Sequence, residues 1–238
     1  MQRLGIDTGG TFTDAVMKMA DGSFRLAKLP TTREDASRAV LDAVDALVVA
    51  ETPIELIHGT TFATNALLTG ELGRVVFVTT AGFADLLAVG RQDRDEVYAL
   101  EPRATRPAQP RSRVVEVTER LDAGGAVVTK LHRAEVARVV ALVAKKKPQA
   151  VAVALLHAFR NPQHEQQLGR ALRKLGVPVM LSFEVAPEVR EYERATTTWA
   201  DAALAPVVRA ALSTLQQRLC ASRVGSQLRI MRSDGGTA

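Results

Sequence analysis

The stretch Gly5-Ile6-Asp7-Thr8-Gly9-Gly10-Thr11-Phe12-Thr13-Asp14 carries the most structural information in this 238-residue chain. Apolar strand patterns lie on both sides of two glycines, which predicts a hairpin whose tight turn uses φ > 0 at glycine. Without Cβ atoms there, a phosphate group could approach the backbone N–H groups. Thr8, Thr11 and Thr13 add hydroxyl groups, and the Asp7 carboxylate could hold a hydrated Mg²⁺ ion. We therefore predict a nucleotide-phosphate hairpin, with an ordinary hairpin turn as the alternative.

Two common phosphate motifs do not occur in this stretch. No Gly-Lys-Ser/Thr follows, as it would in a Walker P-loop, and no GxGxxG opens a helix. The strand–DxGGT–strand form instead resembles the first phosphate hairpin of the actin, hexokinase and acetate kinase superfamily. The predicted strands (3–8, 12–19, 23–29, 55–58, 74–79) and helices (33–50 with Thr32 as N-cap, 63–68) follow in the order βββαβαβ. This order predicts an α/β fold with a ribonuclease H-like core.

The second part of the chain predicts an inserted α/β region. After a Pro- and Arg-rich connection at 100–113, the patterns predict strands at 114–119, 150–156 and 177–182 and helices at 133–146 and 162–175. A long helix from residue 188, which Pro206 would kink or divide, precedes a strand at 228–231 and a turn at 233–236. We therefore expect three parts: 1–99 with the hairpin, 100–185 as the insertion, and 186–238 as the start of a second, incomplete half.

Composition narrows the functional class. The net charge is +5, but the basic residues are dispersed and aromatic residues make up only 4%, which argues against a nucleic-acid-binding surface. No apolar run reaches the roughly 18 residues that span a bilayer. The single Cys220 cannot form an internal disulfide. A cytoplasmic protein without a membrane or nucleic-acid partner is the simplest expectation.

A second chemical candidate follows the predicted strand at 55–58. His58, Thr60 and Thr61 precede a helix that contains Asn65, and a strand end before a helix N-terminus can bind an anion or a carbonyl group. Helix capping and a core histidine are the alternatives, and spacing alone favours them. The histidines form no metal motif. Arg190 and Arg194, four residues apart among glutamates, predict surface ion pairs on the long helix.

Seven stretches together resemble the amino-terminal region of the hydantoinase/oxoprolinase family. They are GIDTGGTFTD (5–14), HGTTFATNALL (58–68), VTTAGFADLLAVGRQ (78–92), TERLDAGG (118–125), LLHAFRNPQHE (155–165), SFEVAPEVREYERATTT (182–198) and IMRSDGG (230–236). They occur in the family's order and cover essentially the whole chain. Family members continue with a second glycine-rich phosphate segment of the DMGGTSTD kind, which this sequence does not contain.

The resemblance implies an ATP-dependent enzyme with Mg²⁺ as a second cofactor. We take Asp7 and His58 as catalytic candidates, with Asp7 also the metal ligand. The nucleotide candidates are Thr8, Gly9, Gly10, Thr11 and Thr13, and the substrate candidates are Thr60, Thr61, Asn65 and Arg91. The implied activity is opening of a hydantoin or 5-oxoproline ring, or a related ATP-dependent carboxylation of a ketone.

Two other classes of function remain as alternatives. The chain could be a non-catalytic subunit or fragment that supplies half of a nucleotide site, completed by a second subunit or a missing carboxyl-terminal half. It could also be a sugar or carboxylate kinase of the same superfamily. Because phosphoryl transfer depends on an enclosed, charge-lined site, we expect the chain alone to hydrolyse ATP poorly or not at all.

Overall fold

The computed structural model describes residues 2–32, 35–48, 52–92, 98, 100, 109–232 and 234–237. The chain folds as two compact units: unit 1 is Met1–Glu71 with Val207–Ala238, and unit 2 is Leu72–Pro206. The division differs from the expected boundaries after residues 99 and 185. Unit 2 is a continuous segment between two parts of unit 1, so the inserted region begins earlier than its sequence patterns predict.

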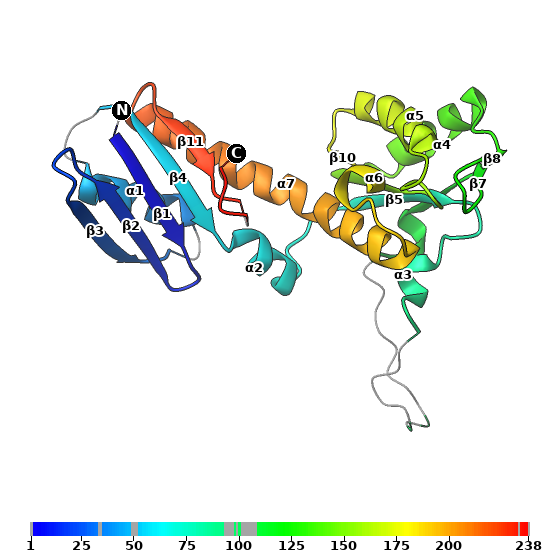
Figure 1. Cartoon of the computed structure of the whole chain (residues 1–238), viewed down its shortest axis with the longest axis horizontal. Coiled ribbons are helices and arrows are strands. Elements are labelled where there is room, and N and C mark those ends of the chain that lie inside the picture. Colours follow the sequence, from blue (N-terminus) through cyan, green and yellow to red (C-terminus); the bar gives the residue numbers. More distant parts are fainter. Residues whose placement is uncertain are drawn as a thin grey trace. The chain divides into compact units, whose positions relative to one another are not determined.

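Unit 1 contains a mixed five-stranded sheet in the order β11-β4-β1-β2-β3 (Figure 1). Its strands are β1 (Gln2–Thr8), β2 (Phe12–Lys18), β3 (Phe24–Pro30), β4 (Ile54–Thr60) and β11 (Gln227–Ile230). The first three strands are antiparallel, whereas β4 runs parallel to β1 and β11 runs parallel to β4. The strand β11, which was predicted to belong to a second half, therefore pairs within this sheet beside β4.

Helices cover one face of the unit 1 sheet. Val40 and Val44 of α1 (Ala36–Leu47) and Leu215 of α7 (Glu191–Ser222) pack with Leu4 and Leu56 in one buried cluster. Residues of β2 alternate strictly between buried and exposed, as in a sheet with one covered face. The N-cap of α1 is Asp35 and not Thr32. The α2 helix (Phe62–Thr69) follows β4 and ends at Gly70, which has the left-handed conformation.

Unit 2 contains a parallel sheet in the order β10-β9-β5-β6. The strands are β5 (Val75–Thr80), β6 (Val114–Val117), β9 (Ala150–Ala154) and β10 (Val179–Leu181), and β7 (Arg120–Leu121) pairs with β8 (Val127–Thr129). The helices are α3 (Leu86–Val89), α4 (Arg133–Lys145), α5 (Gln163–Leu172) and α6 (Ser182–Val185), with short 3₁₀ turns at Arg111–Arg113 and Arg173–Leu175. All residues of β5 and β9 are buried, as in a strand covered on both faces.

This sheet explains why the predicted βββαβαβ order does not describe a single unit. The strand predicted at 74–79 pairs with β9 and β6 of unit 2, because its two apolar faces need cover on both sides. Alternate residues Val76 and Val78 join one buried cluster, and Phe77 joins another with Trp199. The predicted connection at 100–113 and turn at 233–236 lie partly outside the described residues.

The helix α7 continues through Pro206 without interruption, so proline does not divide it. The alternative, a kink at Pro206, stays a prediction. Gly73 packs directly against this position and donates its N–H to the Ala203 carbonyl over 2.8 Å. A Cβ atom added at Gly73 would lie 2.2 Å from Cγ of Pro206 and 3.1 Å from the Ala203 oxygen. The rigid proline ring and the helix backbone leave no room for a side chain here.

We therefore expect Gly73→Ala to lower the free energy of unfolding by about 1–3 kcal/mol, the usual cost of overpacking. Urea unfolding followed by circular dichroism would measure it. Gly10→Ala is the matched control, because a Cβ at Gly10 meets no atom within 4 Å. Equal stability of both variants would contradict the packing argument.

Candidate functional site

The glycine turn links β1 and β2 as predicted. Thr8 pairs with Thr13 at the end of the ladder, and the Gly9 N–H donates to the Phe12 carbonyl over 3.0 Å. The prediction that the turn uses φ > 0 at glycine is wrong, because neither Gly9 nor Gly10 has a positive φ. Gly10 instead leaves open space at the turn, where a Cβ would meet nothing within 4 Å. The turn can therefore admit a group that approaches its backbone closely.

The strand β4 brings the second candidate stretch to the same edge of the sheet. Because β4 is parallel to β1, Thr60 pairs with Thr8, and the Thr61 N–H donates to the Thr8 carbonyl over 3.4 Å. The predicted location of Thr60 and Thr61 beside the hairpin is confirmed. Both hydroxyls also hold α2: Thr60 Oγ1 accepts from the Phe62 N–H at 3.1 Å and Thr61 Oγ1 from Asn65 Nδ2 at 3.4 Å.

A polar pocket of about 750 Å³, which we call the edge pocket, lies at this end of unit 1. Its walls come from the hairpin, the end of β3, the start of α2 and the second part of α7. They include Thr8, Gly9, Gly10, Thr31, Thr32, Asp35, Thr60, Thr61, Asn65 and Thr214. Thr8 is 5% exposed, and its Oγ1 has no hydrogen-bond partner among the described residues. Thr13 is fully buried and its hydroxyl lies 3.0 Å from that of Thr31, so it does not face the pocket.

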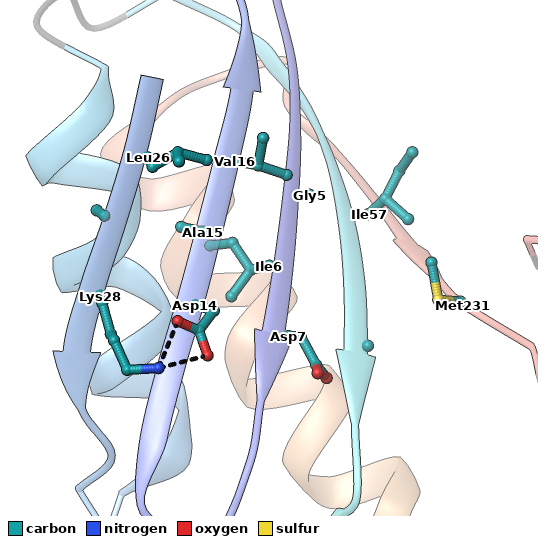
Figure 2. Close-up of a pocket in the computed structure, with 12 residues that line it drawn as sticks. Gly5, Ile6, Asp7, Asp14, Ala15, Val16, Leu26, Lys28, Ile57 and Met231 are labelled. Carbon is teal, nitrogen blue, oxygen red and sulfur yellow. Dashed lines mark hydrogen bonds and ion pairs between the residues drawn. The ribbon is translucent and has the colours of Figure 1, made fainter. Parts of the chain in front are cut away.

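Asp7 faces a different space, on the sheet face that the helices of unit 1 do not cover (Figure 2). Its carboxylate is exposed at the edge of a hollow of about 660 Å³, next to Asp14 and Lys28, which form an ion pair of 3.0 Å. Opposite Asp7 on β4, Gly59 has no side chain, and a Cβ there would lie 3.1 Å from Asp7 Oδ1. A side chain at position 59 would therefore crowd the Asp7 carboxylate, which is exposed to solvent.

His58 points to the opposite, helix-covered face. It pairs with Ile6 across the parallel ladder, one position before the Asp7–Gly59 pair, and neighbouring residues of a strand face opposite sides. Burial lowers the pKa of His58, and the Ile6 backbone and the Asp7 charge oppose this shift only in part. His58 is 6% exposed and its Nδ1 has no partner among the described residues. The two catalytic candidates therefore do not meet on one face.

Arg91, the last substrate candidate, belongs to unit 2. Its Nε lies 2.7 Å from a carboxylate oxygen of Glu193, and both side chains are partly exposed. Arg91 therefore has a local partner within its own unit.

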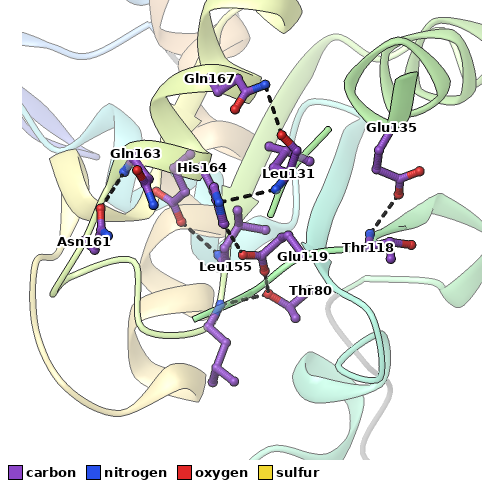
Figure 3. Close-up of polar contacts among 12 residues, drawn as sticks. Thr80, Thr118, Glu119, Leu131, Glu135, Leu155, Asn161, Gln163, His164 and Gln167 are labelled. Carbon is purple, nitrogen blue, oxygen red and sulfur yellow. Dashed lines mark hydrogen bonds and ion pairs between the residues drawn. The ribbon is translucent and has the colours of Figure 1, made fainter. Parts of the chain in front are cut away.

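Sequence reasoning missed a buried polar network in unit 2 (Figure 3). Glu119 Oε2 lies 2.7 Å from Nδ1 of His164, and its other oxygen accepts from the Thr80 hydroxyl. The His164 ring also accepts the Leu131 N–H over 3.4 Å. The network joins β5, the segment between β6 and β7, and α5. Thr80, Glu119 and His164 each belong to one of the seven family stretches. No group of three His, Cys, Asp or Glu side chains that could hold a metal occurs in the described part of the chain.

Arg194 belongs to a second buried group and not to a surface ion pair, so that prediction is wrong. It is 1% exposed and donates to the Leu155 carbonyl (2.9 Å) and the Glu188 carbonyl (3.0 Å). Its Nε also donates to Ser182 Oγ over 3.2 Å. The spacing of residues along α7 cannot predict this burial, because the residues that bury Arg194 follow the distant strands β9 and β10.

Glu165 also belongs to this buried group, and its exposed fraction is 0%. Its carboxylate accepts from Ser182 Oγ (2.6 Å) and from the N–H groups of Leu155 (2.8 Å) and Phe183 (3.2 Å). Desolvation dominates these hydrogen bonds and raises the pKa of Glu165 from 4.5 to about 7. Burial therefore favours the protonated form of this carboxyl group.

This shift predicts a pH effect on stability. A raised folded-state pKa gives stability that is fully present below pH 4.5 and is lost as the pH rises through about 7. We expect Glu165→Gln, which keeps a hydrogen-bonding group without the charge, to flatten the fall in stability between pH 5 and 8. Urea unfolding of both proteins across this range would measure it, and identical slopes would contradict the assignment.

None of the helices in the described part of the chain is long and apolar enough to span a membrane.

A family model described as the hydantoinase/oxoprolinase N-terminal region matches residues 3–176. An uncharacterised protein of Methanocaldococcus jannaschii is 34% identical over 98% of this chain and 35% of its own length. The acetophenone carboxylase gamma subunit of Aromatoleum aromaticum is 32% identical over 99% of this chain and 35% of its own length.

The crystal structure of ATP-dependent caprolactamase from Pseudomonas jessenii matches with a TM-score of 0.81 and 30% identity, over 99% of this chain and 36% of that chain. The chain thus spans about a third of the length of these relatives. Because the family model covers more than half of its residues, the chain belongs to the hydantoinase/oxoprolinase family, in which it corresponds to the N-terminal region.

Proposed function

We propose that unit 1 is a ribonuclease H-like core of the actin and hexokinase superfamily and that its hairpin binds the phosphates of ATP. The strand order β11-β4-β1-β2-β3, with three antiparallel strands followed by parallel ones, supports this assignment. The observation that carries the proposal is the open space at Gly10 beside the polar edge pocket. Phosphate oxygens need close backbone N–H and hydroxyl donors, which this edge supplies.

Thr8 and Thr11 would contribute hydroxyls to the phosphates and Gly10 its backbone N–H group, whereas the Gly9 N–H donates to the Phe12 carbonyl and holds the turn. The exposed Asp7 carboxylate fits Mg²⁺, which usually keeps several waters and takes one or two carboxylates together with phosphate oxygens. The metal would neutralise charge on the phosphates when bound. Phosphoryl transfer depends mainly on such positioning and charge neutralisation.

The reaction class that we propose is ATP-dependent activation of a cyclic amide or a ketone. Transfer of the γ-phosphoryl group to an amide oxygen would create a leaving group and allow water to open the ring. The names of the relatives, a caprolactamase and an acetophenone carboxylase subunit, support these two substrate classes without choosing between them. Thr60, Thr61 and Asn65 would lie near the substrate, and Arg91 remains a substrate candidate on unit 2.

The length of the relatives supports a second proposal, in which this chain supplies only part of the site. Regions equivalent to the other two thirds of the relatives, in the same protein or a partner subunit, would complete it. We therefore expect weak Mg-ATP binding and little turnover by residues 1–238 alone. The cytoplasmic location also remains a prediction.

Titration calorimetry with Mg-ATP tests the hairpin. Gly10→Val should weaken binding at least tenfold, because a branched side chain would occupy the space at the turn. Asp7→Asn should remove the dependence of binding on Mg²⁺. Gly22→Asn is the control, since Gly22 lies in the β2–β3 turn with φ 86°, which asparagine tolerates. Unchanged binding in Gly10→Val would reject the hairpin as the phosphate site.

A further inference from the structure

The sheet face of unit 1 opposite its helices, which we call the open face, carries large exposed apolar side chains (Figure 2). Leu26 is 75% exposed, and Phe24 on the same strand is 62% exposed. Val16 of the neighbouring strand β2 is 38% exposed, and Ile57 of β4 is partly exposed. Apolar side chains that gather on one face with charged residues around them are typical of an interaction surface.

The strand register arranges the side chains of the open face in three rows, because residues two apart on a strand point to the same side. The rows cross β4, β1, β2 and β3 in that order. The amino row is Glu55, Arg3, Lys18 and Phe24; the middle row is Ile57, Gly5, Val16 and Leu26; and the carboxyl row is Gly59, Asp7, Asp14 and Lys28.

The amino row has a net positive charge. Its single acidic residue, Glu55, pairs with Arg3 over 2.7 Å and also with Arg229 of the neighbouring strand β11 over 2.9 Å. Lys18 has no ion pair with any residue that the structure describes. This end of the open face therefore has more positive charges than carboxylates to balance them.

The carboxyl row has a net negative charge. Lys28 pairs with Asp14 over 3.0 Å, which leaves the Asp7 carboxylate without an ion pair among the described residues (Figure 2). The middle row between these two rows has no charged residue on the four strands. The open face is therefore positive at one end, negative at the other and apolar between them.

This order makes the open face complementary to itself. A two-fold axis along the middle row would place the amino row of one copy over the carboxyl row of the other. Lys18 would then face Asp14 of the second copy, and Arg3 would face its Asp7. A two-fold axis parallel to the strands would place each row over itself, so that like net charges would meet. Charge complementarity favours the first arrangement.

We propose that the open face binds a second copy of this chain, with the two sheets packed face to face and their β2 strands antiparallel. Leu26 and Val16 meet their own counterparts at the centre, and Phe24 covers the aliphatic stem of Lys28 from the second copy. Three rows across the sheet supply fewer residues than the about 20–30 on each side of a typical stable interface. We therefore expect a weak dimer.

The inference does not use the proposed function, although the two meet at one residue. Asp7 is the proposed Mg²⁺ ligand, and in the dimer its carboxylate would face Arg3 of the second copy. The metal and the second copy would thus compete for it. Self-association is therefore measured without nucleotide or Mg²⁺.

Sedimentation equilibrium of the 238-residue chain at increasing concentration tests the proposal and should show a monomer–dimer equilibrium. Leu26→Asp should weaken the dimer by about tenfold or more, because two carboxylates would meet at the axis. Leu68→Asp is the matched control, since Leu68 of α2 is 80% exposed and lies outside the open face. It should leave the dimer unchanged.

A charge exchange tests the register. Asp14→Lys and Lys18→Asp should each weaken the dimer by about tenfold, because each brings like charges together in two symmetric contacts. The double variant restores opposite charges in both contacts and should restore the dimer. Both side chains are exposed, so circular dichroism should show an unchanged fold.

The proposal is overturned if the chain stays monomeric, if Leu26→Asp weakens the dimer no more than Leu68→Asp does, or if the double variant fails to recover. If the dimer behaves as expected while Gly10→Val leaves Mg-ATP binding unchanged, the interface stands and the proposed nucleotide site fails.

Discussion

Arg194→Ala should lower the free energy of unfolding of unit 2 by about 3–5 kcal/mol, the cost of breaking a buried charged network from one side. The substitution leaves the carbonyls of Leu155 and Glu188 without this donor, and it leaves Glu165 buried without its nearby positive charge. Trp199 is the single tryptophan of the chain and packs in unit 2, so its fluorescence reports on this unit. Urea unfolding followed at Trp199 would measure the change.

Arg170→Ala is the control for this experiment, because Arg170 is an exposed residue of α5 and its loss should change stability by less than about 1 kcal/mol. Arg194→Met separates packing from charge. It fills much of the same volume without a guanidinium, so it should still be strongly destabilising if hydrogen bonding dominates. A loss below about 1 kcal/mol in Arg194→Ala would show that the network contributes little to unit 2.

Glu119→Ala should have the second largest effect. It leaves His164 Nδ1 and the Thr80 hydroxyl without their shared acceptor, at about 1–3 kcal/mol for each stranded group. The double variant Glu119→Ala/His164→Leu should lose less stability than the sum of the two single variants, because it removes both partners. Glu184→Ala, which breaks only an exposed ion pair with Arg173, provides the control. Strict additivity in the double variant would contradict direct coupling.

Local patterns predicted the local structure well. The alternation on both sides of Gly9 and Gly10 identifies β1 and β2, and the continuous apolar run at 150–156 identifies a fully buried strand. Pairing between distant strands was not accessible. The sequence does not reveal that β5 joins β9 or that β11 joins β4, since both pairings join segments that lie far apart in the chain.

The candidate site shows the same limit. The threonines of the sheet edge were located correctly, because strand ends in a parallel pair meet at one edge. The opposite orientations of Asp7 and His58 follow from a one-residue difference in register, which no single-strand pattern contains. The burial of Arg194 was missed for a similar reason. The spacing of charged residues in a helix sequence is the same whether the side chain lies on the surface or, as here, beneath the ends of β9 and β10.

The position of β11 has a consequence for biosynthesis. The core of unit 1 needs Leu215 and Leu219 of α7, and its sheet needs β11, so the first 71 residues cannot complete their unit until nearly the whole segment has left the ribosome. Unit 2 is continuous from Leu72 to Pro206 and has all its strands by residue 181. Domains usually fold in the order in which they are synthesised. Here the inserted unit 2 is synthesised completely first, and the N-terminal strands of unit 1 can form their full sheet only after β11 has been synthesised.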